Sequence, residues 1–549
     1  MQLTKEQLSA AHSTAPVTVT EASAGSGKTR TLVERINWLL NQQVAPPNIC
    51  VVTFTSAAAK VIQERAHTTQ LGYTGTLHAL MLRLLRHHGH LISLPAELTV
   101  MDETEADTML LGIAGRLKVK ASMKELKKWV TACLETPIGI AKSTPPPAIV
   151  AAEFVRHQKQ TGELSYDSLL VLGLKLIRQH PETAPFRHIL CDESQDNATI
   201  DWQIYAAMKP ETRFYVGDSR QAIYGFRGSD VKGFMALEGD QHPLTVNYRS
   251  SLHVIAAANR IAAKMEHKTA PAQAREDAPP GAVTVTGYQT AAEEINAVGG
   301  LVMKAIAAQQ TVAILLRTNR AADIFRNALA AMGLPVAQVK PVGTAPDEKL
   351  GLALLRAMNA PNNDRLLLKW LEERDGKASA TKLQKQAEAD MTSVATVANM
   401  PELADTILGE PDDALTLAAQ FGAPKAAGFW LHSLAQQVPM PAQLGDLLLE
   451  AQRKPEDAVD DTDAPVIVST IHHMKGREVD VVILPAMEDE SMPGNKTGDD
   501  EQEERRIFYV AVTRAKEACH ISHAATRPDD WQKWKTNTRT LSRFAKDLQ

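Results

Sequence analysis

The sequence has few cysteines and no long apolar run. Its four cysteines are scattered through 549 residues without a Cys-x-x-Cys pair, so neither a disulfide framework nor a zinc site is expected. Free thiols of this kind are typical of the reducing cytoplasm. No apolar stretch approaches the ~20 residues that a bilayer-spanning helix needs. We therefore expect a cytoplasmic protein that does not associate with a membrane.

A large excess of one charge is also missing. The chain carries 59 basic and 64 acidic residues, and its net charge of −5 excludes a polycationic protein whose whole surface attracts nucleic acid. Any contact with nucleic acid must come from local patches. With 44% hydrophobic and 22% charged residues, the composition is that of a folded globular protein. The length suits three or four domains of ~100–200 residues each.

Short apolar, β-rich runs alternate with segments of helical spacing, which predicts α/β domains with buried parallel strands. The predicted strands are 17–20, 49–55, 188–191, 213–216, 311–316, 466–471 and 479–484, and the clearest helices are 29–41, 56–67 and 77–88. Two mostly helical segments interrupt the pattern. We therefore predict a first domain of residues 1–88 and 188–240 with an insertion at 89–187, and a second of residues 241–358 and 464–549 with an insertion at 359–463.

A glycine-rich loop, Ala22 to Thr29 (ASAGSGKT), follows the first predicted strand and leads directly into a helix. Gly25 and Gly27 allow backbone N–H groups to turn toward phosphate oxygens, and the helix N-terminus adds a positive field. Lys28 is then expected at the β- and γ-phosphates and Thr29 at Mg²⁺. Ala22 stands where the strict pattern has glycine. The alternative is a ligand-free Gly/Ser turn, which the flanking strand and helix disfavour.

Two carboxylates, Asp192 and Glu193, end the predicted strand at 188–191. A nucleotide-bound Mg²⁺ needs a carboxylate in this position, and Asp192 is the candidate. Glu193 is placed to orient and deprotonate an attacking water. Paired carboxylates at a strand end also serve as helix caps, but together with the phosphate loop they predict a nucleotide hydrolase.

Further motifs follow in a fixed order, and the chain resembles a superfamily 1 DNA helicase of the UvrD/Rep/PcrA type from Leu3 to Phe544. The resemblance implies an α/β fold of two RecA-like parallel-sheet motor domains, each interrupted by a mostly helical insertion, of which the second is reduced here. It implies ATP and Mg²⁺ as ligands, and single-stranded and tailed duplex DNA as partners. The matching segments are residues 3–7, 52–58 (motif Ia), 75–78 (Ib), 192–196 (II), 216–228 (III), 247–250 (IV), 469–478 (V) and 503–516 (VI).

The resemblance assigns a role to individual residues. For ATP binding they are Gln7, Ala24, Gly25, Ser26, Gly27, Lys28, Thr29, Arg30, Tyr248 and Glu478, with Thr29 and Asp192 as metal ligands. For catalysis they are Glu193, Gln221, Arg249 and Arg514. For DNA binding they are Phe54, Thr55, His78, Tyr224, Phe226, Arg227, Thr470, His472 and Lys475.

Two of these predictions have open alternatives. Tyr224 and Phe226 can stack on unpaired bases for ~1–3 kcal/mol each, but such rings also pack at domain interfaces. A run of cations from Arg116 to Lys128 in the first insertion is either a contact for the DNA backbone or a solvated helix face.

Arg249, Arg514 and Lys28 are far apart in sequence, so they can meet at one phosphate only between two domains. Opening and closing around ATP would then drive stepping along a strand. Two functions remain open. The first is an ATP-driven 3′-to-5′ single-stranded DNA translocase and helicase. The second is a nucleotide-gated DNA-binding ATPase subunit that signals to a partner protein, such as a nuclease in repair or phage defence.

Overall fold

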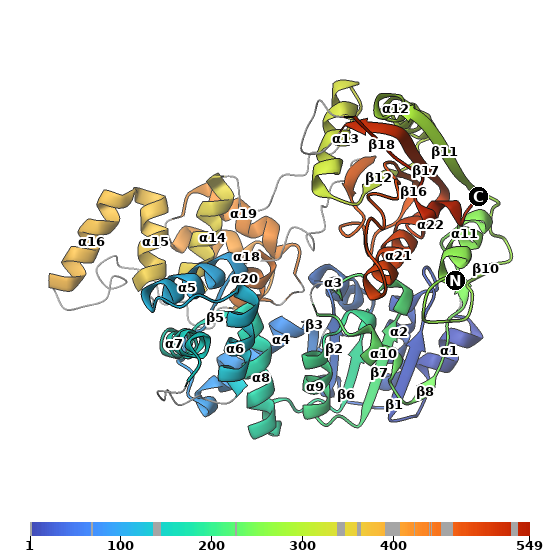
Figure 1. Cartoon of the computed structure of the whole chain (residues 1–549). Helices are drawn as coiled ribbons and strands as arrows, with labels where there is room; N and C mark the ends of the chain where they lie inside the picture. The colour runs from blue at the N-terminus through green and yellow to red at the C-terminus, as the bar shows by residue number, and fades with distance from the viewer. Residues whose placement is uncertain are drawn as a thin grey trace.

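The computed structural model places two parallel sheets on one side of the molecule and a helical lobe on the other (Figure 1). The described residues are 3–66, 68, 70–135, 144–225, 228–336, 346–359, 364–389, 407–421, 423–438, 440, 442–451, 465–528 and 536–549. Phe226 and Arg227, two of the predicted DNA contacts, lie outside them. The predicted fold class, α/β with two parallel-sheet domains, is confirmed.

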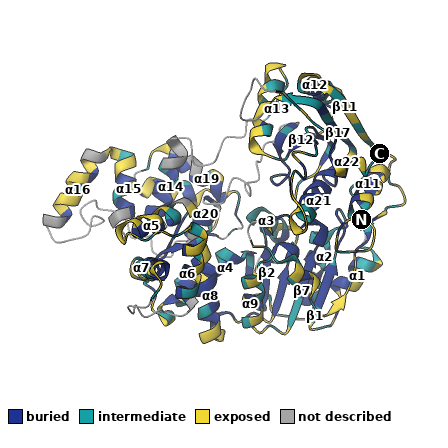
Figure 2. Ribbon diagram, viewed as in Figure 1, coloured by how far each residue is buried: buried dark blue, intermediate teal, exposed yellow. Residues whose placement is uncertain are grey.

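The first sheet is built from the apolar runs of the N-terminal part. Among the described residues its strand order is β3-β2-β6-β7-β1-β8, and all neighbouring strands are parallel. Alternate side chains point to opposite faces, so Cys50 and Val52 join the apolar core on one face while Ile49 and Val51 join the core on the other. Burial on both faces explains the continuous apolar runs (Figure 2). The elements are β1 Val17–Glu21, β2 Ile49–Thr53, β3 Tyr73–Thr76, β6 His188–Cys191, β7 Thr212–Gly217, β8 Asp240–Gln241, α1 Lys5–Ala11, α2 Lys28–Asn41, α3 Ser56–Arg65, α9 Thr199–Ala207 and α10 Val231–Met235.

The second sheet has the order β11-β17-β16-β12-β15 in the described part of the chain, again with parallel neighbours, and β18 adds an antiparallel edge on β17. Two apolar cores flank it, one containing Ala313 and Leu315 and the other Val312 and Ile314. The elements are β11 Ala282–Thr290, β12 Val312–Leu316, β15 Val466–Thr470, β16 Val479–Leu484, β17 Ala515–Pro528, β18 Thr536–Thr538, α11 Leu252–Ala262, α12 Ala291–Ala307, α13 Asn319–Ala331, α21 Asp499–Val512 and α22 Arg543–Lys546; a short pair, β9 Val246–Asn247 and β10 Gln273–Ala274, lies between the sheets in sequence.

The helical lobe combines both insertions, whose helices lie side by side in Figure 1. Helix α4 (Leu77–His88) leads from the first sheet into it. The first insertion contains β4 Thr99–Met101, α5 Glu103–Arg116, α6 Met123–Glu135, α7 Pro146–Thr161, β5 Glu163–Ser165 and α8 Tyr166–Gln179. The second contains α14 Pro346–Asn359, α15 Asp364–Asp375, α16 Lys377–Ala389, β13 Ile407–Leu408, α18 Asp413–Gln420, α19 Lys425–Ala435, β14 Ala442–Gln443 and α20 Leu444–Ala451.

One predicted domain boundary fits the packing poorly. Residues 346–358 were expected in the second α/β domain, but they form α14, which packs on α15, α19 and α20 in the helical lobe. We therefore propose that the second insertion begins before Pro346. Within the described residues, no helix combines the length and apolar character that crossing a bilayer requires.

Candidate functional site

The carboxyl end of β1 continues into a tight loop and then into α2. Gly25 and Gly27 have φ angles of +71° and +84°, the left-handed region that favours glycine. A Cβ at Gly25 would lie 2.7 Å from Cβ of Arg249, and one at Gly27 would lie 2.6 Å from Nε2 of Gln7. Only bare backbone fits here. The loop can therefore present N–H groups at the N-terminus of α2, an arrangement that binds phosphate.

The side chains around this loop fit a nucleotide. The hydroxyl of Ser26 is buried and has no hydrogen-bond partner among the described residues, whereas buried polar groups are normally paired. Gln7 donates from Nε2 to the carbonyl of Ser26 at 2.9 Å, and a capping box with Thr4 fixes Gln7 in the first turn of α1. An unpaired hydroxyl within a bare-backbone loop is what an incoming anionic ligand would satisfy.

The two predicted metal ligands are adjacent. Asp192 follows β6, and the hydroxyl of Thr29 donates to Oδ2 of Asp192 at 3.4 Å. Burial, together with the neighbouring charge of Glu193, raises the pKa of Asp192 to about 7. A divalent cation at this position would favour the charged carboxylate. Carboxylate and hydroxyl oxygens are also the ligand types that Mg²⁺ takes, so the pair fits this ion.

Glu193 has a strained backbone and a fixed side chain. Its φ of +49° is uncommon for a residue other than glycine and is typical of functional positions. Its carboxylate accepts a hydrogen bond from Nε2 of Gln195 at 2.6 Å. Burial opposes its ionisation, but the charges of Lys28 and Lys475 outweigh this effect and lower the pKa of Glu193 to about 2. Glu193 is therefore ionised at neutral pH.

Arg514 reaches the same place from the second α/β domain. It follows α21, is 1% exposed, and donates from Nη2 to Oε1 of Gln221 at 2.9 Å. Gln221 in turn donates from Nε2 to Oδ2 of Asp218 at 2.7 Å. Burial, with a contribution from Arg249, lowers the pKa of Arg514 to about 9, which leaves it protonated at neutral pH. A permanent cation from one domain is thus bonded to an amide of the other.

Arg249 and Tyr248 lie on another side of the phosphate loop. The backbone N–H of Tyr248 donates to the carbonyl of Gly25 at 2.9 Å. The guanidinium of Arg249 forms an ion pair with Glu478 and donates to the carbonyl of Thr513 at 3.3 Å. Arg249 was expected at the γ-phosphate and Glu478 at the ribose. In this conformation they bind each other, so a nucleotide would compete with this ion pair.

Two predicted DNA contacts are turned inward at the junction of the two domains. Tyr224 is 4% exposed, and its ring stacks on Phe54 with a centroid distance of 4.8 Å. The ammonium of Lys475 lies 4.7 Å from the centroid of the same ring. Lys475 also forms an ion pair with Asp196 and donates to the carbonyl of Gln221 at 2.7 Å. In this conformation the Tyr224 ring and Lys475 are both packed between the domains, so their contact with a base or a phosphate stays a prediction.

Four more predicted DNA contacts among the described residues lie on separate elements. Thr55 caps α3 and accepts a hydrogen bond from the N–H of Ala58 at 3.1 Å. His78, in the first turn of α4, packs against Tyr166 with a ring-centroid distance of 4.0 Å. Thr470 and His472 line a pocket, and burial lowers the pKa of His472 to about 4, so its ring is neutral at neutral pH.

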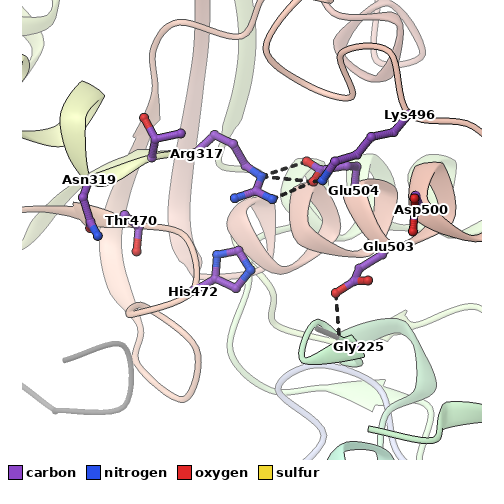
Figure 3. Close-up of a pocket in the computed structure, with 10 residues that line it drawn as sticks. Gly225, Arg317, Asn319, Thr470, His472, Lys496, Asp500, Glu503 and Glu504 are labelled. Carbon is purple, nitrogen blue, oxygen red and sulfur yellow. Dashed lines mark hydrogen bonds and ion pairs between the residues drawn. The ribbon is translucent and has the colours of Figure 1, made fainter. Parts of the chain in front are cut away.

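This pocket has a volume of about 670 Å³ and lies between the loop after η5 (Ser219–Gln221) and the second sheet (Figure 3). Figure 3 shows Arg317 and Lys496 converging on Glu504 from two directions. Arg317 binds Glu504 through both Nε, at 2.9 Å, and Nη2, at 2.7 Å. The N–H of Gly225 donates to Glu503 at 3.2 Å from the first domain. The pocket is therefore lined by both cations and carboxylates.

Comparison with known proteins settles the family. Residues 3–242 match the UvrD/REP helicase N-terminal domain, and residues 243–397 and 433–526 match the UvrD-like helicase C-terminal domain. The chain belongs to the UvrD/REP helicase family. Its resemblance to this family, predicted from the motifs, is thereby confirmed.

Named relatives of this helicase are similar over nearly its whole length. The ATP-dependent DNA helicase PcrA of Staphylococcus aureus (strain Mu50) is 26% identical, and the alignment covers 95% of this chain and 83% of the relative. PcrA of Staphylococcus epidermidis (strain ATCC 12228) is 26% identical, over 96% of this chain and 84% of the relative. A solved structure, the C-terminal domain of a possible DNA helicase from Lactobacillus plantarum WCFS1, matches 55% of this chain and 94% of its own length at 11% identity, with a TM-score of 0.25. By enzyme class, the chain is an ATP-dependent DNA helicase.

Some residues of the helicase pocket were not singled out from the sequence. Arg317 and Asn319 directly follow β12, and Leu316 at the end of this strand pairs in register with Thr470 at the end of β15. The carboxyl ends of parallel strands meet at one edge of a sheet. Polar residues that directly follow a predicted buried strand, as Arg317 and Asn319 do, could therefore have been identified from the sequence as candidates for this pocket.

The first insertion of the helicase carries an exposed basic patch where α5 ends and α6 begins. Its members are Arg116, Lys118, Lys120, Lys124 and Lys128. All are exposed, and none forms an ion pair with a described residue. By contrast, Lys127 is bound to Glu103 and Asp107 at 3.0 Å each.

Proposed function

We propose that this chain hydrolyses ATP between its two α/β domains, and that it uses the cycle to translocate 3′ to 5′ along single-stranded DNA and to open tailed duplexes. One observation carries the proposal: cations that belong to the second α/β domain contact the phosphate loop and the neighbouring Gln221 of the first domain. Arg249 is packed against Gly25, and Arg514 is bonded to Gln221. Charge that develops on a transferred phosphoryl group can then be stabilised from both domains, but only while the domains are closed.

In this proposal the phosphate loop and Lys28 bind the β- and γ-phosphates, and Gln7 reads the adenine. Thr29 and Asp192 would hold Mg²⁺, which neutralises phosphate charge when bound. Glu193 orients the attacking water and accepts its proton. Ala24, Ser26 and Arg30 complete the loop, with Tyr248 and Glu478 contributed from beyond the first domain.

Gln221 supports coupling between ATP and DNA. Its side chain is bonded to Arg514, while its carbonyl accepts a hydrogen bond from Lys475, whose ammonium lies over the ring of Tyr224. We infer that a change at the γ-phosphate shifts this chain of contacts and uncovers or covers the ring. Hydrolysis would thereby alternate the grip on a single strand.

A strand-displacement assay tests the function and its polarity. With ATP and Mg²⁺, a duplex with a 3′ single-stranded tail should be opened, and the same duplex with a 5′ tail should stay intact. ATP hydrolysis, measured in parallel, should rise strongly when oligothymidine is added. DNA-stimulated hydrolysis without displacement of either duplex would favour the alternative, a nucleotide-gated subunit that acts through a partner such as a nuclease.

The basic patch of the first insertion leads to a prediction about duplex binding. Replacing Lys120, Lys124 and Lys128 together with alanine should weaken binding to a tailed duplex, because contacts between lysines and phosphates supply much of the affinity for DNA. Each lost phosphate contact should also reduce the slope of log Kd against log salt by about 0.9. Single-stranded DNA should still stimulate ATP hydrolysis to the wild-type rate. Fluorescence anisotropy over a salt series measures the slope.

The matched control for this patch removes exposed cations elsewhere in the lobe. Lys382 and Lys385 on α16 are exposed, and replacing both with alanine should leave the salt slope unchanged. A reduction of the slope in proportion to the number of charges removed in each variant would show that the effect is one of overall charge.

A further inference from the structure

The second insertion belongs to one domain by sequence and to the other by packing. It lies between β12 and β15, two strands of the second sheet. Its buried residues Leu354, Trp370 and Leu448 nevertheless share one apolar core with Leu80 and Leu84 of α4. Neither core of the second sheet contains a described residue of this insertion. Figure 1 shows its helices in the lobe, beside α4 to α8.

A buried arginine fastens the two insertions together. Arg356 on α14 is 5% exposed, and it binds Oε1 of Glu105 at 2.7 Å and Oδ2 of Asp102 at 3.0 Å. Asp102 and Glu105 form the capping box at the N-terminus of α5. Both terminal nitrogens of the guanidinium are therefore used, and the charge is matched by carboxylates that the first insertion already holds in place.

The second insertion also contacts the two helices that begin at predicted DNA contacts. Lys60 on α3 donates to the carbonyl of Gln436 at 2.6 Å, and Gln63 on α3 donates to the carbonyl of Met440 at 2.7 Å. Helix α20 packs on α4. Helix α3 begins directly after Thr55, and His78 lies in the first turn of α4.

We propose that the second insertion is a brace of the first α/β domain. It moves with that domain during the ATP cycle and holds α3 and α4, and with them Thr55 and His78, in the orientation that binds a single DNA strand. Lys60, Gln63 and Arg356 are positioning residues, because they act through the two helices and do not touch the strand. This inference rests on the proposed function for the identity of the ligand.

Distances between spin labels test whether the brace moves with the first domain. The four native cysteines are buried, so labels can be directed to cysteines introduced at exposed positions. In the pair Leu111→Cys and Glu373→Cys, which joins the two insertions, the distance should not change when a non-hydrolysable ATP analogue and oligothymidine are added. In the pair Met303→Cys and Glu373→Cys, which joins the second domain to the brace, it should change. A nucleotide-dependent change in the first pair would overturn the proposal.

Positioning is tested by DNA affinity. Gln63→Ala and Arg356→Ala should each raise the Kd for oligothymidine, measured without nucleotide, by roughly 3- to 30-fold, while the basal ATPase rate stays at wild type. Arg356→Lys should recover part of the affinity because it restores the charge without the planar fork. The matched control is Glu64→Gln, an exposed residue of α3, which should bind normally.

The two experiments separate failure of the brace from failure of the proposed function. If the nucleotide changes the distance in neither labelled pair, the domain closure in the proposed function is wrong. The Kd values of Gln63→Ala and Arg356→Ala for oligothymidine then test the brace on their own. Wild-type affinity in both Gln63→Ala and Arg356→Ala contradicts the brace even where ATP-driven translocation is observed.

Discussion

Replacing Glu193 with glutamine is expected to slow ATP hydrolysis by about 10²- to 10⁴-fold while ATP binding persists. The two side chains have nearly the same shape, and an amide oxygen can still accept the hydrogen bond that Gln195 donates at 2.6 Å. What is lost is the negative charge that Lys28 and Lys475 maintain at neutral pH. Phosphate release at saturating ATP and oligothymidine measures hydrolysis, and a fluorescent ATP analogue measures binding.

The control for Glu193→Gln removes a different, half-buried carboxylate of the same domain. Asp201 caps α9 by accepting the N–H of Ala198 at 2.8 Å, and burial raises the pKa of Asp201 to about 6. Asp201→Asn should therefore hydrolyse ATP at nearly the wild-type rate. A Glu193→Gln protein that no longer bound ATP would show that the residue supports the nucleotide site and is not the base.

Strands that are buried on both faces could be predicted from the sequence, because any run of apolar side chains can fill such a position and no specific distant partner is required. The apolar runs at 49–55 and 311–316 became β2 and β12 with nearly the predicted ends. β11 was not predicted, because it is an edge strand with exposed and half-buried residues in place of an apolar run. β17 was not predicted either, since it follows α21 without a glycine or proline and alternates apolar with polar residues.

The phosphate loop could be located from sequence because its chemistry is local. Glycines, a lysine and a hydroxyl follow one another between a strand and a helix, and the structure places them against Gln7 and Arg249. The orientation of Lys475 could not be predicted, because its partner Asp196 is 279 residues away. Only the meeting of the two domains decides that this ammonium turns toward a carboxylate and a tyrosine ring.

The packing of the second insertion shows the same limit on a larger scale. Helical spacing revealed its helices, but nothing in the spacing indicates which domain they pack against. That choice depends on surfaces such as the capping box at α5, which accepts Arg356 from more than 250 residues away. The predicted boundary after residue 358 consequently cut α14 from the helices on which it packs.

Arg514→Ala is expected to lower kcat by ~10³-fold or more, with a much smaller change in ATP affinity. The guanidinium is buried, is protonated, and is bonded to Gln221 across the domain junction. A planar cation in this position can meet charge that spreads over the γ-phosphate oxygens only as the reaction proceeds. Steady-state hydrolysis with saturating oligothymidine gives kcat, and titration with a non-hydrolysable analogue gives the affinity.

A structural role for Arg514 would look different, and Arg505 provides the comparison. Arg505 lies on α21, but it binds Asp547 at 2.9 Å and stacks over Phe544 at 4.4 Å, on the side of α22. Arg505→Ala should therefore lower the melting temperature and leave kcat close to wild type at temperatures where the protein is folded. Arg514→Lys should keep the charge but lose the fork, so its kcat should fall between wild type and Arg514→Ala. If Arg514→Ala instead lowered the melting temperature as Arg505→Ala does and kept its kcat, the residue would be a packing group at the junction and the γ-phosphate would have to be sensed through Arg249 alone.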